Sequence, residues 1–295
     1  MHPGPLLLAV PNVSEGSDPR LVAELGKAFA RARLLDTHSD ADHGRSVFTL
    51  AARQRDVPAA LLAGARGTVE RLDLREQDGL HPRVGVLDVA PVVYLAPELR
   101  GAACAAALTA AALIGEDLGL PVFLYGDLAT NPAHRERADL RRGGPAAMAA
   151  RLARGELRPD HGPPRAHPSA GAVLVTARPP LVAFNLDLDS DDVELARAIA
   201  AELRESGGGS PGVRAMGLYL PARGRAQVSM NVAAPGPGTL AELAEAVRRR
   251  APVAEAELVG LAPAAALEGF PEDIPLRDFD PARHLIENAL GSLEP

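Results

Sequence analysis

The sequence predicts an α/β (α+β) fold made of two ferredoxin-like subdomains, with mixed or antiparallel sheets covered by helices. Three observations carry this prediction. Apolar runs of strand length alternate with amphipathic helical runs along the chain. From residue 182 the order reads β-α-β-β-α-β, and the first half shows a longer version of the same succession. The Arg178-Pro179-Pro180 step separates the halves, so we expect domains at 1–178 and 181–295 and an active site in the cleft between them.

The elements of the first half begin with a buried apolar strand over Leu6–Val10. Asp18 and Pro19 then open a helix, because aspartate caps an N-terminus and proline fits the first turn. The segment 135–154, rich in arginine and alanine, predicts a helix with a solvated cationic face, which is favoured over the alternative of a surface that attracts carboxylates. The proline-rich segment 158–169 predicts a long loop. Apolar runs place strands at 34–36, 46–51, 87–95 and 122–125, and helices at 56–72 and 98–118.

The elements that follow alternate in the same way. Ser190-Asp191-Asp192 begins a helix that the glycines 207–209 end. Thr239 and Glu242 predict a capping box for the next helix, since a threonine N-cap and a glutamate three residues later satisfy each other's backbone amides. Strands are expected at 172–177, 182–188, 213–220, 226–232 and 254–259.

The composition is that of a globular protein with room for two cores of ordinary domain size, since 47% of its 295 residues are hydrophobic and 23% are charged. It disfavours a nucleic-acid binder. A net charge of -7 offers no concentrated cationic surface for phosphates, and 3% aromatic residues without tryptophan offer few platforms for base stacking.

Cysteine usage and the N-terminus bear on the compartment. The single Cys104 excludes an intrachain disulfide and a cysteine metal cluster, and its place in an alanine-rich helical run favours a buried structural thiol. The first residues lack the basic flank and the apolar run of a signal peptide, and no apolar stretch approaches the roughly 20 residues of a membrane span. We therefore expect a cytoplasmic protein with no nucleic-acid or membrane partner.

The stretch Asp78–Pro91 combines titratable side chains with a restricted backbone at the entrance to a strand. Pro82 disfavours a helical conformation at His81, so the imidazole projects from a loop. Its reference pKa of about 6.5 lets it take or give a proton at neutral pH. Arg83 fits the role of holding a carboxylate, and Asp88 that of fixing a neighbouring group. The alternative, from the residues alone, is an ordinary surface histidine.

Other polar groups each have two interpretations. Two aspartates and a histidine in Asp40–His43 suggest a metal site, but a polar loop is favoured because dedicated sites need more converging ligands. Gln227 and Asn231 lie four apart in a strand and share a face, where their amides bind a ligand or satisfy sheet-edge polar groups. Asn12, between a strand and a helix, binds a ligand or caps the turn.

The segment His81–Pro91 resembles the HPRxGxxDVxP signature of the glutamate formimidoyltransferase family. One short match is weak, but further segments resemble the family in the same order, from near the first residue to about residue 267. These eight segments are 10–16, 45–49, 114–116, 121–126, 159–163, 181–185, 226–231 and 257–261.

The resemblance implies transfer of a formimino group from N-formimino-L-glutamate to tetrahydrofolate, giving 5-formiminotetrahydrofolate and glutamate in histidine degradation. His81 matches the family's catalytic histidine and acts as general acid and base; tetrahydrofolate is a co-substrate, and no metal is needed. Arg83, Arg45 or Arg178 holds the substrate carboxylates. The expected substrate- and folate-binding residues are Asn12, Arg45, Arg83, Gly162, Pro163, Pro164, Arg165, Ala166, His167, Pro168, Ser169, Ala170, Gly171, Gln227 and Asn231.

The chain departs from the family pattern at four positions. Gly44, Gln77, Leu80 and Ala170 stand where many members have asparagine, histidine, glutamate and an aromatic residue. Two alternatives therefore stay open: a paralogue acting on another folate-borne one-carbon group, and a non-catalytic binder of folate or a carboxylate ligand that keeps the fold. By analogy we expect a homodimer without the separate helical cyclodeaminase domain.

Overall fold

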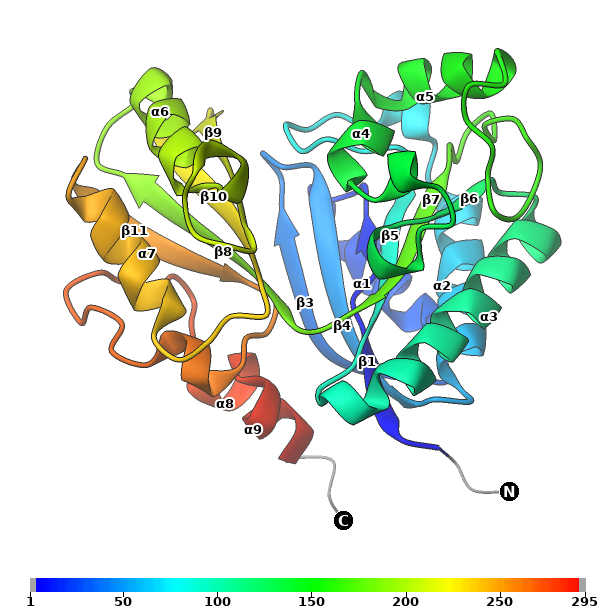
Figure 1. The fold of residues 1–295 in the computed structure, drawn as a ribbon, viewed down its shortest axis with the longest axis horizontal. Helices are drawn as coiled ribbons and strands as arrows, with labels where there is room; N and C mark the ends of the chain where they lie inside the picture. Colours follow the sequence, from blue (N-terminus) through cyan, green and yellow to red (C-terminus); the bar gives the residue numbers. More distant parts are fainter. Residues whose placement is uncertain (1–3, 292–295) are drawn as a thin grey trace. The chain divides into compact units, whose positions relative to one another are not determined.

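The computed structural model of the chain describes residues 4–291, which divide between Pro179 and Pro180 into two compact units. Each unit has its own sheet, of seven strands in the first and four in the second, and its own hydrophobic core. The predicted combination of helices with two separate sheets is confirmed. Figure 1 shows the elements of both units in sequence colours.

The first unit follows the predicted alternation, with β3 and β4 longer than expected and the arginine-rich segment split into two helices. Its strands are β1 (Leu6–Ala9), β2 (Asn12–Val13), β3 (Arg33–Asp40), β4 (Arg45–Arg53), β5 (Leu87–Val93), β6 (Val122–Leu124) and β7 (Val173–Arg178). Its helices are α1 (Pro19–Ala28), α2 (Val57–Arg71), α3 (Arg100–Leu118), α4 (Arg137–Arg141) and α5 (Gly144–Ala153). At α1, the Asp18 carboxylate accepts from the amides of Arg20 and Leu21, as the capping prediction requires.

The first sheet has a ferredoxin-like part and a parallel extension. β1 and β2 both lie between β4 and β5, and β3 pairs with β4, which gives the antiparallel order β3-β4-β1/β2-β5. β7 then pairs parallel with β5, and β6 parallel with β7. Parallel strands need a crossover connection, and α3 supplies it between β5 and β6.

Helices cover the first sheet on both faces, and each face has its own apolar cluster. Helices α1, α2 and α3 pack on one face over a core that includes Leu25, Leu61 and Ile114. On the other face, Leu140 of α4 and Met148 of α5 pack with β-strand residues in a smaller cluster. Figure 1 shows α4 and α5 on the opposite side of β5 and β7 from α3. This second face carries the polar residues described below.

Helix α3 corrects one sequence expectation. Within residues 4–291, Pro97–Leu118 is long and apolar enough to cross a membrane by length and composition, with a mean hydropathy of 1.4 in its best window. The expectation of no such stretch was therefore wrong. Length and composition do not separate a membrane span from a core helix, and α3 packs Ala107, Ala111 and Ile114 into the first core. Cys104 in the same helix is half-buried rather than buried.

The second unit has the predicted β-α-β-β-α-β order. Its elements are β8 (Leu181–Leu188), α6 (Val193–Leu203), β9 (Val213–Leu220), β10 (Arg225–Ala233), α7 (Thr239–Arg248) and β11 (Val253–Val259), followed by short helices α8 (Pro281–His284) and α9 (Ile286–Gly291). The antiparallel sheet order β11-β8-β10-β9 is that of a ferredoxin-like fold. Its two long helices, α6 and α7, cover one face of the sheet (Figure 1).

The predicted capping box of α7 is wrong. The helix N-cap is Gly238, in a left-handed conformation with φ of 69°, and it makes no side-chain cap bond. The Thr239 hydroxyl instead donates to the Gly236 carbonyl at 2.8 Å. The sequence pattern was displaced by one residue, because a glycine tolerates the positive φ that the preceding turn imposes.

Candidate active site

The His81 loop lies between two other segments of the first unit at close backbone contact. A Cβ on Gly44 would lie 2.0 Å from the Asp78 carbonyl oxygen, and one on Gly85 would lie 2.0 Å from the Ala172 carbonyl oxygen. Gly44 also has a positive φ of 58°. An asparagine at position 44 would therefore displace the loop, so the departure at Gly44 fits this backbone packing.

Asp88 is the centre of the charge cluster beside this loop. The carboxylate is fully buried at the start of β5 and accepts from the Val84 amide at 2.9 Å. Arg45, from the start of β4, donates Nη1 to Oδ2 at 2.9 Å, and Arg141 of α4 donates Nη2 to the same oxygen. The sequence interpretation that Asp88 fixes a neighbouring group is thus met by two arginines from distant segments.

Arg45 in turn positions the imidazole. Its Nη1 lies 2.8 Å from His81 Nδ1, while the Asn12 side-chain oxygen accepts from its Nε at 2.9 Å and from its Nη2. Asn12 also donates its amide to the Val10 carbonyl. Asn12 and Arg45, both predicted to bind substrate, therefore already hold each other and the histidine, so their first role in the site is orientation.

The charges of the cluster set the protonation of its members. Burial alone raises the pKa of Asp88, but Arg141 and Arg45 outweigh it, and the pKa lies below the usual 3.8. Burial lowers the pKa of Arg45 to about 10, which leaves it charged at neutral pH. Burial, followed by the charges of Arg45 and Arg141, holds the pKa of His81 well below 6.5. His81 is therefore a neutral imidazole at pH 7.

The two ring nitrogens of His81 have different surroundings. Nδ1 lies 2.8 Å from both the Pro82 carbonyl oxygen and Arg45 Nη1, so it donates to the first when protonated and accepts from the second when not. No residue within the described range 4–291 forms a hydrogen bond with Nε2. In the Nδ1–H tautomer, Nε2 keeps a lone pair and can act as a base. In the other tautomer, Nε2–H can donate.

Arg83 and the loop 162–171, also predicted to bind substrates, form hydrogen bonds within or beside the His81 loop. Arg83 is buried and turns back on its own loop, donating Nη2 to the Gly79 carbonyl at 2.9 Å. The predicted folate loop, 162–171, ends beside the His81 loop, because Gly85 and Gly171 form a β-bridge. Within it, His167 Nδ1 accepts from the Ala170 amide at 3.1 Å, and Ala170 itself is buried.

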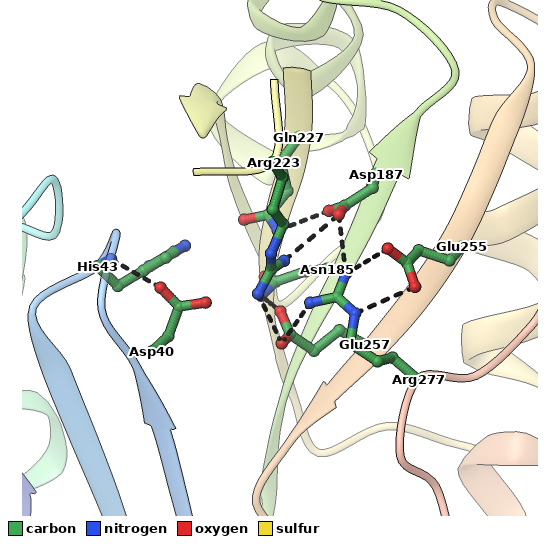
Figure 2. A network of polar contacts seen from close by, with 9 residues as sticks. All are labelled: Asp40, His43, Asn185, Asp187, Arg223, Gln227, Glu255, Glu257 and Arg277. Carbon is green, nitrogen blue, oxygen red and sulfur yellow. Dashed lines mark hydrogen bonds and ion pairs between the residues drawn. The ribbon is translucent and has the colours of Figure 1, made fainter. Parts of the chain in front are cut away.

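In the second unit, Gln227 and a further amide, Asn185, belong to a separate charge network on the sheet face opposite α6 and α7. Gln227 donates to Asp187 at 2.7 Å and Asn185 to Glu257 at 2.9 Å (Figure 2). Asn231, four residues along the same strand, is half-buried, and no side-chain hydrogen bond joins it to this network within residues 4–291. Position on an inner strand, rather than a sheet edge, explains why these amides bond to carboxylates on the neighbouring strands.

Two arginines balance the carboxylates of this network. Arg277, from the segment after β11, donates to Asp187, Glu255 and Glu257 at 2.8–3.1 Å. Arg223, from the turn between β9 and β10, lies 3.3 Å from both Asp187 and Glu257 (Figure 2). The network ties the chain after β11 to the sheet.

Sequence reasoning missed Arg141. It lay in the segment 135–154 that was interpreted as a solvated cationic face, yet its side chain is largely buried and pairs with Asp88. Asp40–His43 forms a polar turn, in which Asp40 accepts from the His43 amide at 2.8 Å (Figure 2). Among residues 4–291, no group of three His, Cys, Asp or Glu side chains is placed to hold a metal.

Comparison with known proteins shows that both units match the models of one protein family. The profile of the formiminotransferase domain, N-terminal subdomain, matches residues 6–178, and that of the formiminotransferase domain matches residues 183–269. The chain belongs to the formiminotransferase family. Both matched ranges carry one of the two sheets, and His81 lies in the first.

Relatives in this family include single-function and bifunctional enzymes. The chain is 36% identical over 290 residues to glutamate formimidoyltransferase of Streptococcus pyogenes serotype M1, covering 95% of this chain and 97% of that enzyme. It is 32% identical to the enzyme of that name from Thermoplasma acidophilum, covering 89% of both. It is 36% identical to formimidoyltransferase-cyclodeaminase of Sus scrofa, covering 89% of this chain but 51% of that protein.

Proposed function

We propose that this formiminotransferase moves the formimino group of N-formimino-L-glutamate to tetrahydrofolate, giving 5-formiminotetrahydrofolate and glutamate, with His81 as general acid and base. The observation that carries the proposal is a neutral imidazole whose Nδ1 lies 2.8 Å from both Arg45 Nη1 and the Pro82 carbonyl oxygen, and whose Nε2 is without a partner within residues 4–291. The names of the relatives in Streptococcus pyogenes and Thermoplasma acidophilum support it.

The proposed chemistry is addition followed by elimination. The folate amine attacks the amidine carbon, a carbon–nitrogen bond forms, and the intermediate carries a proton on the attacking nitrogen. His81 Nε2 takes that proton. It then gives a proton to the glutamate nitrogen, the bond from that nitrogen to the one-carbon unit breaks, and glutamate leaves as a neutral amine. Proton transfer of this kind typically contributes about 10²- to 10⁴-fold in rate.

The charge cluster suits both proton transfers. A low pKa keeps His81 unprotonated and ready to act as a base at pH 7. The same low pKa makes the transient imidazolium a stronger acid, since Arg45 and Arg141 repel it, and so favours protonation of the leaving nitrogen. Asp88 holds both arginines in place without itself contacting the imidazole.

The folate is proposed to bind along the loop 162–171, whose last residues form the bridge to Gly85. Tetrahydrofolate acts as a co-substrate, and positioning two substrates in one site can itself supply several kcal/mol without a metal or a covalent intermediate. Ala170 is buried, so this side chain offers no stacking surface to a pterin ring. We propose that backbone groups of the loop, rather than an aromatic side chain, contact the ring.

The decisive test is a spectrophotometric assay of the purified protein with tetrahydrofolate and N-formimino-L-glutamate. The proposal predicts formation of the 5-formimino product in proportion to enzyme. A matched His81→Ala protein should lose turnover while still binding tetrahydrofolate. Folate binding by both proteins without turnover in either would contradict the transferase and favour the non-catalytic alternative.

We also propose a compartment and an oligomeric state. The single Cys104 and the family resemblance support a cytoplasmic homodimer. Light scattering coupled to gel filtration tests the dimer: a mass near twice 30.7 kDa supports it, and a mass near 30.7 kDa contradicts it. Fractionation of native cells tests the compartment, and recovery of the protein outside the cytoplasmic fraction would contradict the proposal.

A further inference from the structure

Arg178, the last residue of β7, is a half-buried cation for which residues 4–291 offer no acidic partner. Its Nη1 donates to the neighbouring Pro179 carbonyl at 3.0 Å, and no carboxylate of residues 4–291 forms an ion pair with it. Burial lowers the pKa of Arg178 to about 10, which leaves it charged at neutral pH. A charge that is partly removed from water and has no counter-ion is unfavourable. This arrangement suits an anion supplied from outside the chain.

Tyr125 lies beside it with an unused hydroxyl. The residue follows β6, its amide donates to the Val175 carbonyl, and its side chain is only 6% exposed. Its hydroxyl is buried and has no hydrogen-bond partner within residues 4–291. Since side chains alternate along β7, Arg178 shares a face with Thr176, whose hydroxyl donates to the Tyr125 carbonyl. Buried hydroxyl groups are nearly always paired, so this one is placed for a ligand.

Arg137 adds a second cation to the same place. Its guanidinium lies 5.7 Å from the centre of the Tyr125 ring, and its charge contributes to the lowered pKa of Arg178. Arg137 and Arg141 are four apart on α4, on one side of the helix and about 6 Å apart along its axis. Arg141 completes the His81 cluster, so one helical turn separates that cluster from the Tyr125 ring.

Two other arginines near His81, Arg45 and Arg83, have carboxylates beside them. Arg45 pairs with Asp88 and also donates to Asn12. Arg83 has the carboxylates of Asp88 and Asp78 close enough to raise its pKa against the lowering effect of burial. Among residues 4–291, no carboxylate acts on Arg178 in this way, and Tyr125 is the group that opposes the effect of burial on its pKa.

We propose that Arg178, Arg137 and the Tyr125 hydroxyl hold the side-chain carboxylate of the formimino donor. The inference rests on the proposed function and assigns a positioning site to it. A guanidinium binds a carboxylate through two parallel hydrogen bonds, which fixes direction as well as distance. One helical turn is also of the order of the separation between the amidine carbon and the side-chain carboxylate of N-formimino-L-glutamate, so the bound donor would present that carbon to His81.

Three substitutions test the site by steady-state kinetics with both substrates varied. Tyr125→Phe removes one hydroxyl and keeps the ring, Arg178→Gln removes the charge, and Arg178→Lys keeps the charge without the planar fork. Hydrogen bonds to charged groups predict that Arg178→Gln raises KM for the donor about 10- to 100-fold, with smaller increases for the other two. KM for tetrahydrofolate stays unchanged in all three. The matched control is Arg142→Gln, an exposed arginine paired with Asp139 just after α4, which leaves both constants unchanged.

An altered donor locates the carboxylate. The wild type should have a higher KM for N-formimino-L-glutamine than for N-formimino-L-glutamate, and the two values should converge in Arg178→Gln, because the charge that distinguishes the donors is gone. A KM unaffected by Arg178→Gln, or raised equally for both donors, overturns the inference while leaving the transferase intact.

Calorimetric titration with L-glutamate, the proposed product, gives a readout that does not need turnover. Weaker glutamate binding by Arg178→Gln than by the wild type supports the site. Equal binding by the two folded proteins overturns it. An inactive wild type that still binds glutamate through Arg178 would instead contradict the proposed function, so the two failures are distinct.

Discussion

The two units each carry a polar cluster on a sheet face, and the clusters differ in how their charges balance. In the first, Arg45 and Arg141 share the single carboxylate of Asp88, and an unprotonated His81 lies against Arg45. In the second, the carboxylates of Asp187, Glu255 and Glu257 meet two arginines, and each guanidinium is bonded to more than one of them.

This difference distinguishes a reactive cluster in the first unit from a structural network in the second. Arg277 has its donors directed at carboxylates of two neighbouring strands, so that network is satisfied internally and fixes a segment. The first cluster keeps an excess of positive charge beside a ring nitrogen that is open within the described residues. Such a cluster attracts anionic substrates and perturbs a titratable group, which is the pattern expected of a reactive site.

The largest expected effect follows from removing the open imidazole. His81→Ala should lower kcat about 10²- to 10⁴-fold, because proton transfer to and from the two nitrogen atoms is lost. The urea midpoint and the affinity for tetrahydrofolate should match the wild type, which separates chemistry from folding. A kcat close to that of the wild type would mean that the first cluster is not the reactive one.

Asp88→Asn tests what the shared carboxylate holds together. The change leaves Arg45 and Arg141 buried without a counter-ion, and breaking a buried pair of this kind typically costs about 3–5 kcal/mol of unfolding free energy. Urea denaturation provides the measurement. The control is Asp127→Asn, which removes an exposed partner of Arg100. Similar urea midpoints for the two variants would rule out Asp88 as the centre of the cluster.

Arg277→Ala tests the second network in the same way. Asp187 and Glu257 keep their ion pairs with Arg223, while Glu255 loses its pair with Arg277. An unsatisfied buried polar partner costs about 1–3 kcal/mol. The loss should be smaller than at Asp88, since the Arg277 side chain is 20% exposed and water can partly replace it. Arg250→Ala, which breaks an exposed pair with Glu202, is the matched control and should leave the urea midpoint unchanged. Equal effects of Arg277→Ala and Arg250→Ala on the urea midpoint would contradict the structural role of the second network.

The smallest effect is the pH dependence that the low pKa of His81 implies. Because the folded pKa lies below 6.5, the unfolded chain takes up this proton first, so the contribution of His81 to stability is full above pH 6.5 and declines below it. The rate kcat/KM should likewise stay level from pH 8 to 6.5 and fall only at lower pH. If kcat/KM begins to decline above pH 6.5 while the urea midpoint does not, the decline belongs to a group other than His81.

Local sequence signals predicted most of the fold. The apolar run and alternation at 213–220 and 226–232 gave the β9–β10 hairpin, and Asp18 with Pro19 gave the start of α1. The predicted N-cap of α7 was wrong because Thr239 was assigned the position that Gly238 occupies. The positive φ at Gly238 depends on the preceding turn, and the threonine–glutamate pattern does not report the shape of that turn. Helix α3 showed that apolar length does not distinguish burial in a sheet protein from burial in a bilayer.

The candidate site likewise contains residues that the local sequence predicted and residues that only the tertiary structure reveals. His81 and Asp88 were found because they lie within eight positions of each other in one motif. Arg141 was missed because its partner lies 53 residues away, and only tertiary packing brings the two together. Asn12 and Arg45 were expected to contact substrate, and the structure adds the bond between them that a sequence cannot show.

The most direct test of the charge account is the ionisation of His81 itself. Nuclear magnetic resonance of protein labelled with ¹⁵N-histidine follows each ring through a pH titration, and the His81→Gln spectrum identifies the signal. The account predicts that His81 remains neutral at pH 6.5 and titrates well below it in the free enzyme. A midpoint at or above 6.5 would show that Arg45 and Arg141 do not control the imidazole, and would contradict the account.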